Sequence, residues 1–148
     1  MKSDALLDTN VVVAMLIEAH EHHGASLALL TAGDGVRYAI AAHSYAEAYS
    51  TLTRLGANAP FQLTAEEAWA ALESVRAVTA LIGLTAPQSF EAIRGYAQGG
   101  GIGARLYDRL IGEAAVAHDI PTILTWNVRH MRGLFPGLSV LTPGEWGL

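Results

Sequence analysis

The sequence predicts an α/β domain built on a parallel sheet. Short runs rich in aliphatic and β-branched residues alternate along the chain with longer segments of helical periodicity. Strands separated by helices pair in parallel, because each crossover brings the chain back to the same end of the sheet. The length of 148 residues is typical of one domain, and we expect a single domain over residues 1–148.

The N-terminal part begins with the apolar run Ala5–Leu7, which we expect to be a short buried strand. Helices are expected over Asn10–Glu18 and His20–Leu30, and the second ends at the turn signal Gly33-Asp34-Gly35. The β-rich run Arg37–Ala41 is expected to be the second strand.

The middle of the chain predicts two helices. The first, Ser44–Leu55, has an apolar stripe at helical spacing: Tyr45, Ala48, Tyr49, Leu52 and Leu55. Gly56–Pro60 interrupts the chain, and Thr64 with Glu67 three residues later forms a capping-box signature. The second helix is therefore expected from Thr64 to about Val75.

The C-terminal half continues the alternation. Pro87 favours the first turn of a helix, and a glycine-rich loop at 99–103 precedes a further strongly periodic segment. In that segment Tyr107, Leu110, Ile111, Ala114 and Val116 are expected to supply the apolar surface. The expected elements are the strands Val78–Leu84, Pro121–Thr125 and Ser139–Leu141 and the helices Pro87–Tyr96 and Tyr107–His118.

Composition narrows the functional classes. The net charge of −5 argues against a protein that coats nucleic acid, and the absence of cysteine excludes a disulfide scaffold and a thiolate metal site. No apolar stretch approaches the roughly 20 residues of a membrane span, and Asp4 and Asp8 interrupt any signal-peptide core. We therefore expect a cytoplasmic protein with no membrane partner.

Four polar residues fall at the places where strands end or helices begin. Asp8 follows the first expected strand, Asn127 follows Pro121–Thr125, Glu47 lies early on a helix and Asp108 opens another. Each has an ordinary structural explanation: a helix cap, a turn residue, a solvated helix face or an acid in a first turn. For Asp8 alone, cap and binding site are equally good interpretations, and one carboxylate can serve as both.

The four residues together favour a metal site. The carboxyl ends of parallel strands share one edge of the sheet, which is where ligands bind in such folds. Two carboxylates about 4 Å apart repel by about 4 kcal/mol at an effective dielectric constant of 20, so a cluster implies a cation or shared protons. Oxygen ligands suit Mg²⁺ or Mn²⁺.

These residues carry a resemblance to a known family. The motifs are Leu6-Leu7-Asp8-Thr9-Asn10, Ala46-Glu47, Tyr107-Asp108, Thr125-Trp126-Asn127 and the tail Trp126–Met131. In this order and spacing, over nearly the whole chain, they resemble the PIN-domain ribonucleases, and among them the VapC-type toxins of type II toxin–antitoxin pairs.

The resemblance implies a three-layer α/β/α sandwich around a short parallel sheet. It also implies a Mg²⁺- or Mn²⁺-dependent endoribonuclease that hydrolyses RNA phosphodiester bonds, a VapB-like antitoxin as partner, and a homodimer. The catalytic and metal-binding residues would be Asp8, Glu47, Asp108 and Asn127. Because the fourth is Asn127 and not Asp, the site carries three formal negative charges, and the number of metal ions stays open.

The same hypothesis assigns roles to residues around the metal ligands. Thr9 and Thr125 would hydrogen bond to the metal ligands and orient them. Four arginines near the late motifs are candidate RNA contacts, although for any single one a solvated surface residue is the favoured explanation. They are Arg105, Arg109, Arg129 and Arg132. The cluster of His20, His22 and His23 is a weaker metal-site candidate.

Two other classes remain open. A receiver-type signalling module also has an Asp at a strand end, but it needs a nearby lysine, and the sole lysine is Lys2. A catalytically inert PIN-like scaffold that only binds a partner is compatible with Asn127. A phosphotransferase of the dehalogenase type would need a second Asp where Asn10 stands, and the Gly99–Gly103 segment lacks the strand and lysine of a P-loop.

Overall fold

The computed structural model describes residues 2–55 and 62–147. Its centre is a parallel sheet of five strands in the order β3-β2-β1-β4-β5. The strands are β1 (Ala5–Leu7), β2 (Tyr38–Ala41), β3 (Ala80–Ile82), β4 (Thr122–Leu124) and β5 (Ser139–Leu141). The predicted α/β class and the parallel sheet are confirmed.

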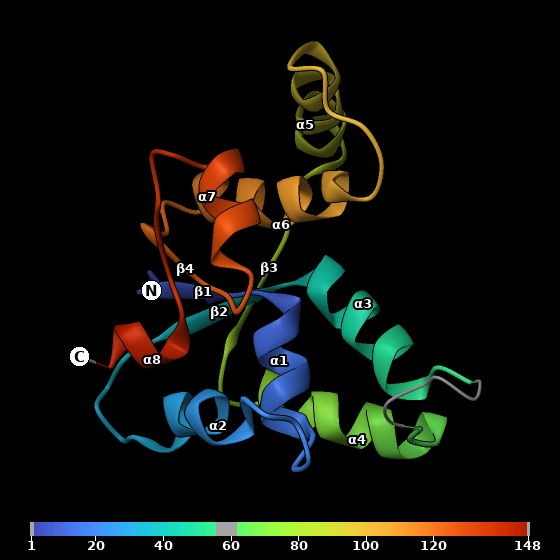
Figure 1. Cartoon of the computed structure of the whole chain (residues 1–148), viewed down its shortest axis with the longest axis vertical. Helices are drawn as coiled ribbons and strands as arrows, with labels where there is room; N and C mark the ends of the chain where they lie inside the picture. Colours follow the sequence, from blue (N-terminus) through green and yellow to red (C-terminus); the bar gives the residue numbers. More distant parts are fainter. Residues whose placement is uncertain (1, 56–61, 148) are drawn as a thin grey trace.

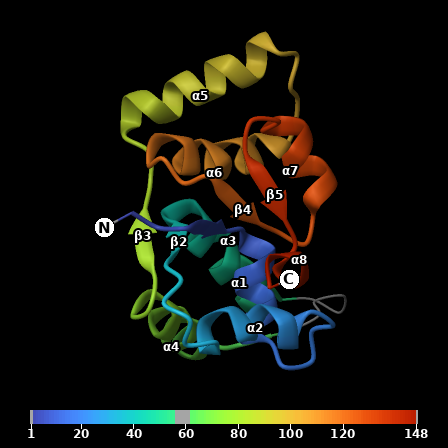
Figure 2. The same ribbon diagram turned by 90° about the vertical axis from the view of Figure 1, so that its left-hand side faces the viewer.

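Helices cover both faces of this sheet, which makes the three-layer α/β/α sandwich that the family resemblance implied (Figures 1 and 2). One face carries α1 (Thr9–Leu16), α2 (His23–Thr31), α3 (Ala42–Thr53) and α4 (Ala65–Arg76). The other carries α5 (Ala86–Gln98), α6 (Arg105–Ala117) and α7 (Val128–Leu134), while the last helix is α8 (Pro143–Trp146). Helix α5 is the outermost element and packs on α6.

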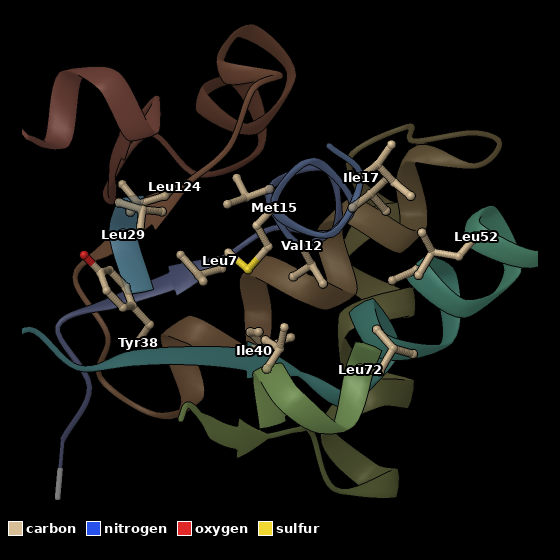
Figure 3. Packing of buried hydrophobic residues seen from close by; sticks show 14 of the residues in the cluster. Leu7, Val12, Met15, Ile17, Leu29, Tyr38, Ile40, Leu52, Leu72 and Leu124 are labelled. Atoms are coloured by element: carbon tan, nitrogen blue, oxygen red, sulfur yellow. The ribbon is translucent and has the colours of Figure 1, made fainter. Parts of the chain in front are cut away.

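The three central strands β1, β2 and β4 are buried on both faces, whereas the edge strands β3 and β5 are partly exposed, and alternate side chains enter two separate cores. Leu7 and Ile40 belong to the core beneath α1–α4, whereas Leu6 and Ile123 belong to the core beneath α6 and α7. Figure 3 shows the first core, where Leu52 of α3 and Leu72 of α4 approach the sheet from the helical layer. Burial on both faces explains why the strands read as short apolar runs rather than as alternating sequences.

The capping signals are confirmed at atomic detail. The Thr64 hydroxyl accepts from the Glu67 backbone N–H at 3.1 Å, and the Glu67 carboxylate accepts from the Thr64 N–H at 2.9 Å. Pro87 lies in the first turn of α5, as expected. The expected break at Gly56–Pro60 lies outside the described residues.

Several element boundaries differ from the sequence expectation. The second helix begins at His23 because residues 17–22 form turns, and the third strand is only Ala80–Ile82. Two short helices, α7 and α8, were not predicted. Helix α8 has the signals of a helix start in Thr142, Pro143 and Glu145, but it spans only one turn, too short for a periodic pattern.

The apolar faces of two helices were also predicted too broadly. On α3, Ala48 and Leu52 are buried, but Tyr49 is 37% exposed, and Leu55 beyond the helix is 77% exposed. On α6, Val116 is 47% exposed. The buried face of α6 instead consists of Ile111, Gly112, Ala114 and Ala115.

Gly112 explains why that face is made of small residues. A Cβ atom built at this position would lie 2.0 Å from the Phe135 ring. Phe135, just after α7, therefore packs directly against the backbone of α6. The same two helices also meet near their starts, where His130 of α7 contacts Arg105 of α6.

Candidate metal and nucleic-acid site

Asp8 is held at the carboxyl end of the central strand β1. It is 4% exposed and is the N-cap of α1, because its Oδ1 accepts from the Thr9 backbone N–H at 2.8 Å. Its Oδ2 accepts from the Thr125 hydroxyl at 2.8 Å. The carboxylate is therefore a cap and also faces the pocket described below, so the two interpretations of Asp8 coexist.

Glu47 and Asp108 approach Asp8 from helices on opposite layers. Glu47, on the second turn of α3, accepts from the Thr9 hydroxyl through Oε1 at 2.9 Å. Asp108 lies in the first turn of α6 and is partly buried. Thr9 thus contacts both the β1 and the α3 carboxylates, and Thr125 contacts the β1 carboxylate.

Burial and mutual repulsion make the acids reluctant to ionise. The pKa of Asp8 is raised from 3.8 to about 6, mainly by burial and also by the nearby charges of Asp108 and Glu47, while hydrogen bonds from Thr125 and Thr9 oppose the rise. The pKa of Asp108 is also raised, first by burial and then by the charge of Glu47. Such a shift in a cleft is typical of functional sites.

These residues line one pocket of about 330 Å³ at the carboxyl edge of the sheet. All four predicted site residues face it, and so do Thr9, His20 and His130. The remaining lining residues are Asn10, Val13, Thr51 and Met131. The topology of the chain therefore brings the four predicted residues together at one edge of the sheet.

The donor chemistry of this pocket fits a hydrated divalent cation. Within residues 2–55 and 62–147, no three acidic or histidine side chains lie close enough to enclose an ion by themselves. Mg²⁺ keeps several of its waters and needs only one or two direct carboxylates, and the lining of the pocket offers three, Asp8, Glu47 and Asp108. The raised pKa values of Asp8 and Asp108 are the electrostatic cost that a cation would remove.

Asn127 lies directly after β4 and is the N-cap residue of α7, yet its side chain makes no capping bond. Its backbone N–H donates to the Thr125 hydroxyl at 3.0 Å. Its side-chain amide instead lies 2.7 Å from Nδ1 of His130, one turn further along α7. The side chain of Asn127 therefore does not cap α7, although a helix cap was one ordinary explanation for an asparagine at this position.

The four candidate arginines separate into two pairs. Arg109 forms an ion pair with Glu113 at 2.9 Å, and Arg132 donates twice to the Val140 carbonyl, at 3.2 and 2.9 Å. Arg105 and Arg129 line a second pocket that adjoins the first through His130. Only the second pair is therefore close to the acidic pocket.

Sequence reasoning missed two residues that shape the site. Asn10 accepts from the Trp126 backbone N–H at 3.0 Å and donates to the Thr125 hydroxyl at 3.1 Å, so it ties α1 to the segment after β4. His130 contacts both Asn127 and Arg105. Its spacing of three residues from Asn127 would have been a signal if α7 had been predicted.

The three histidines near the N-terminal turn do not form a separate metal cluster. His22 stacks on Trp126 with ring centroids 3.8 Å apart, and His23 Nδ1 lies 3.0 Å from the Ala14 carbonyl. The His22 N–H donates to His20 Nδ1 at 3.0 Å, and His20 itself reaches the acidic pocket. The cluster is therefore mainly structural packing around Trp126.

Comparisons with known proteins identify the family to which this parallel α/β sandwich belongs. The PIN domain profile matches residues 5–132, and the chain belongs to the PIN domain family. No curated protein matches the chain by sequence.

Several solved structures have a similar fold. DNA-bound VapBC from Salmonella typhimurium matches with a TM-score of 0.67 and 20% identity, over 97% of this chain and 99% of that one. VapC20 from Mycobacterium tuberculosis, a toxin that cleaves the sarcin-ricin loop, matches with a TM-score of 0.63 and 16% identity over 80% and 86%. FitAcB from Neisseria gonorrhoeae matches with a TM-score of 0.61 and 20% identity over 97% and 99%.

The structure also bears on the membrane question. Across the part of the chain that it describes, no helix is both long and apolar enough to cross a bilayer.

Proposed function

We propose that the chain is a metal-dependent endoribonuclease and the toxin of a VapBC-type toxin–antitoxin pair. The observation that carries this proposal is the acidic pocket at the carboxyl edge of a PIN-domain sheet, with Asp8, Glu47 and Asp108 on its wall. The inert scaffold is the weaker alternative, because a protein that only binds a partner has no need for buried carboxylates with raised pKa values.

In this proposal Asp8, Glu47 and Asp108 hold one Mg²⁺ or Mn²⁺ ion, partly through water. When bound, such a cation supplies a water of lowered pKa and a counter-charge for the phosphoryl oxygens. Asn127 is the fourth polar side chain of the site, and the orientation of its amide decides whether it offers an oxygen to the cation or an N–H to the substrate.

The other residues act on these ligands. Thr125 and Thr9 each donate a hydrogen bond to the Asp8 carboxylate, which favours its ionised form and fixes its orientation. The Thr9 hydroxyl holds Glu47 Oε1, while Oε2 of the same carboxylate lies 4.0 Å from Nε2 of His43. Arg105 and Arg129, beside the pocket, carry positive charge for the RNA phosphates.

The partner follows from the family. Several solved relatives with this fold are complexes of a toxin with its antitoxin, and we propose a VapB-like antitoxin for this chain. We further propose that the chain is a single cytoplasmic domain that forms a homodimer. A receiver-type module finds no support, since no lysine lines the pocket within the described residues.

Cleavage of a mixed RNA pool tests the proposal. Wild-type protein should cleave RNA with Mn²⁺ and lose this activity with a chelator, and Asp108→Asn should abolish it. Glu66→Gln, an exposed acid in the first turn of α4, is the matched control and should cleave like wild type. Cleavage by Asp108→Asn at the wild-type rate would contradict the assignment of the site.

A further inference from the structure

Both ring nitrogens of His130 are occupied by neighbouring side chains. Nε2 lies 2.8 Å from Nη2 of Arg105, which begins α6. Nδ1 lies 2.7 Å from Nδ2 of the Asn127 side-chain amide, at the start of α7. His130 and Asn127 line the acidic pocket, whereas Arg105 lines the adjoining one.

The number of available protons restricts how these three groups can bond. A guanidinium has N–H donors and no acceptor, so Nε2 of His130 must be the unprotonated nitrogen that accepts from Arg105. A neutral imidazole has one N–H, and it must then be on Nδ1. The atom of Asn127 that faces Nδ1 must consequently be an acceptor, so the bonding network requires the amide to be turned over, with Oδ1 in the place that Nδ2 has in the structure.

The other protonation states fail at the same distance. If Nε2 carried a hydrogen, two N–H groups would point at each other across the 2.8 Å between His130 and Arg105. A doubly protonated ring would add a second positive charge beside the guanidinium. Amide oxygen and nitrogen have nearly the same shape, so the bonding network decides which of the two faces the histidine.

We propose that Arg105 and His130 orient the Asn127 amide so that Nδ2 is the atom available to the pocket, which makes Asn127 a hydrogen-bond donor to an RNA phosphate oxygen and not a metal ligand. This inference rests on the proposed function, because it assigns a role within that site. Asp8, Glu47 and Asp108 then hold the cation without Asn127, and Arg105 and His130 are positioning residues.

The position of the pair suits this role. Arg105 precedes Asp108 by three residues on α6, and the positive charge of Arg105 opposes the larger rise that burial and the charge of Glu47 cause in the pKa of Asp108. The two basic groups therefore lie on the same side of the pocket as Asp108. An N–H donor on this side adds a neutral contact for an anionic phosphate beside the positive charge of Arg105.

The position of the His130 proton tests the orientation without metal or RNA. Long-range ¹H–¹⁵N NMR spectra of the metal-free protein at about pH 8 should place the proton on Nδ1 in wild type. Arg105→Ala removes the obligate donor and should move the proton to Nε2, while Arg129→Ala removes a neighbouring cation that has no bond to His130 in the described structure and should leave it on Nδ1. A proton on Nε2 in wild type, or no change in Arg105→Ala, would overturn the inference.

Binding measurements test the role assigned to Asn127. Calorimetry with Mn²⁺ alone should give the same affinity for Asn127→Ala as for wild type. In an Asp8→Asn background, which should not cleave, Asn127→Ala should weaken binding of labelled single-stranded RNA by about tenfold, as expected for a lost hydrogen bond to a charged group. Weaker Mn²⁺ binding, or unchanged RNA binding, would refute the donor role.

These outcomes are separable from failure of the proposed function. If wild type neither binds Mn²⁺ nor cleaves RNA, the proposed function is wrong, and the NMR result still decides the orientation of Asn127. If wild type binds Mn²⁺ and cleaves RNA while Asn127→Ala loses Mn²⁺ affinity, only the further inference is wrong.

Discussion

The raised pKa of Asp8 predicts that this residue destabilises the metal-free protein at neutral pH. Its carboxyl has a pKa of about 6 in the folded protein against 3.8 for the unperturbed group. The folded state therefore binds the proton more tightly than the unfolded state, and stability rises as the pH falls from above 6 toward 4. At about pH 8 the full penalty is about 3 kcal/mol, from a difference of about two pKa units at 1.36 kcal/mol each.

The substitution Asp8→Asn removes this ionisation and keeps most of the structure. The asparagine Oδ1 can still accept from the Thr9 N–H, so the helix cap is retained. The Thr125 hydroxyl loses its bond to Oδ2 and can turn to Oδ1 of Asn10, 3.4 Å away. A lost hydrogen bond costs about 1 kcal/mol, so the variant should be more stable than wild type by about 2 kcal/mol at about pH 8.

Urea unfolding of both proteins in the presence of a chelator measures this difference. Between about pH 8 and about pH 4.5 the advantage of Asp8→Asn should shrink by about 2 kcal/mol, since protonation of wild-type Asp8 relieves the same penalty. Titrations of groups that do not interact with Asp8 cancel in the comparison. A constant difference across the pH range, or a variant that is less stable at every pH, would show that Asp8 is only a helix cap.

Three further perturbations follow from the same structure. Thr125→Val removes a buried hydroxyl that donates to Asp8 and should destabilise the fold by about 2–3 kcal/mol in urea unfolding; a change below about 0.5 kcal/mol would be inconsistent with that bond. Gly112→Ala places a Cβ 2.0 Å from the Phe135 ring and should cost about 1–3 kcal/mol, whereas Gly133→Ala in α7 meets nothing within 4 Å and should stabilise by about 0.5–1 kcal/mol; equal effects would refute the close packing. Mn²⁺ affinity measured by calorimetry should fall by about tenfold per pH unit below about pH 6, because a proton competes for Asp8; affinity independent of pH would exclude that carboxylate as a ligand.

The strands and the principal acids could be predicted from sequence because their signals are local. A doubly buried parallel strand is a short apolar run, and Asp8 comes directly after such a run. Once the strands were assigned as parallel, topology brought Asp8 and Asn127 to one edge. Glu47 and Asp108 followed from their places near helix starts together with the family motifs.

The residues that sequence reasoning missed depend on contacts between distant segments. Asn10 bonds to Thr125 and Trp126 across more than one hundred positions, and no local pattern announces such a pair. His130 could not be assigned a role because α7 is short and its periodicity is weak. The exposure of Val116 was missed because the sequence of α6 does not show that α7 covers only part of its apolar side.

The side-chain amide of Asn127 illustrates a further limit. Its placement beside the acids is a matter of topology, but the atom that it offers to the pocket is set by Arg105 and His130. The family motif identifies the residue but does not identify the side chains that orient its amide. A hydrogen-bond donor and a metal ligand can therefore share one motif position.

The central claim is that the carboxylates of the β1–α1 junction, α3 and α6 hold a divalent cation. Calorimetric titration of Mn²⁺ into wild type and Asp8→Asn at about pH 7.5, without RNA, tests it most directly. We predict saturable Mn²⁺ binding to wild type and at least about tenfold weaker binding to Asp8→Asn, since a direct charged ligand is lost. Equal affinity in the two proteins, or no binding to wild type, would contradict it.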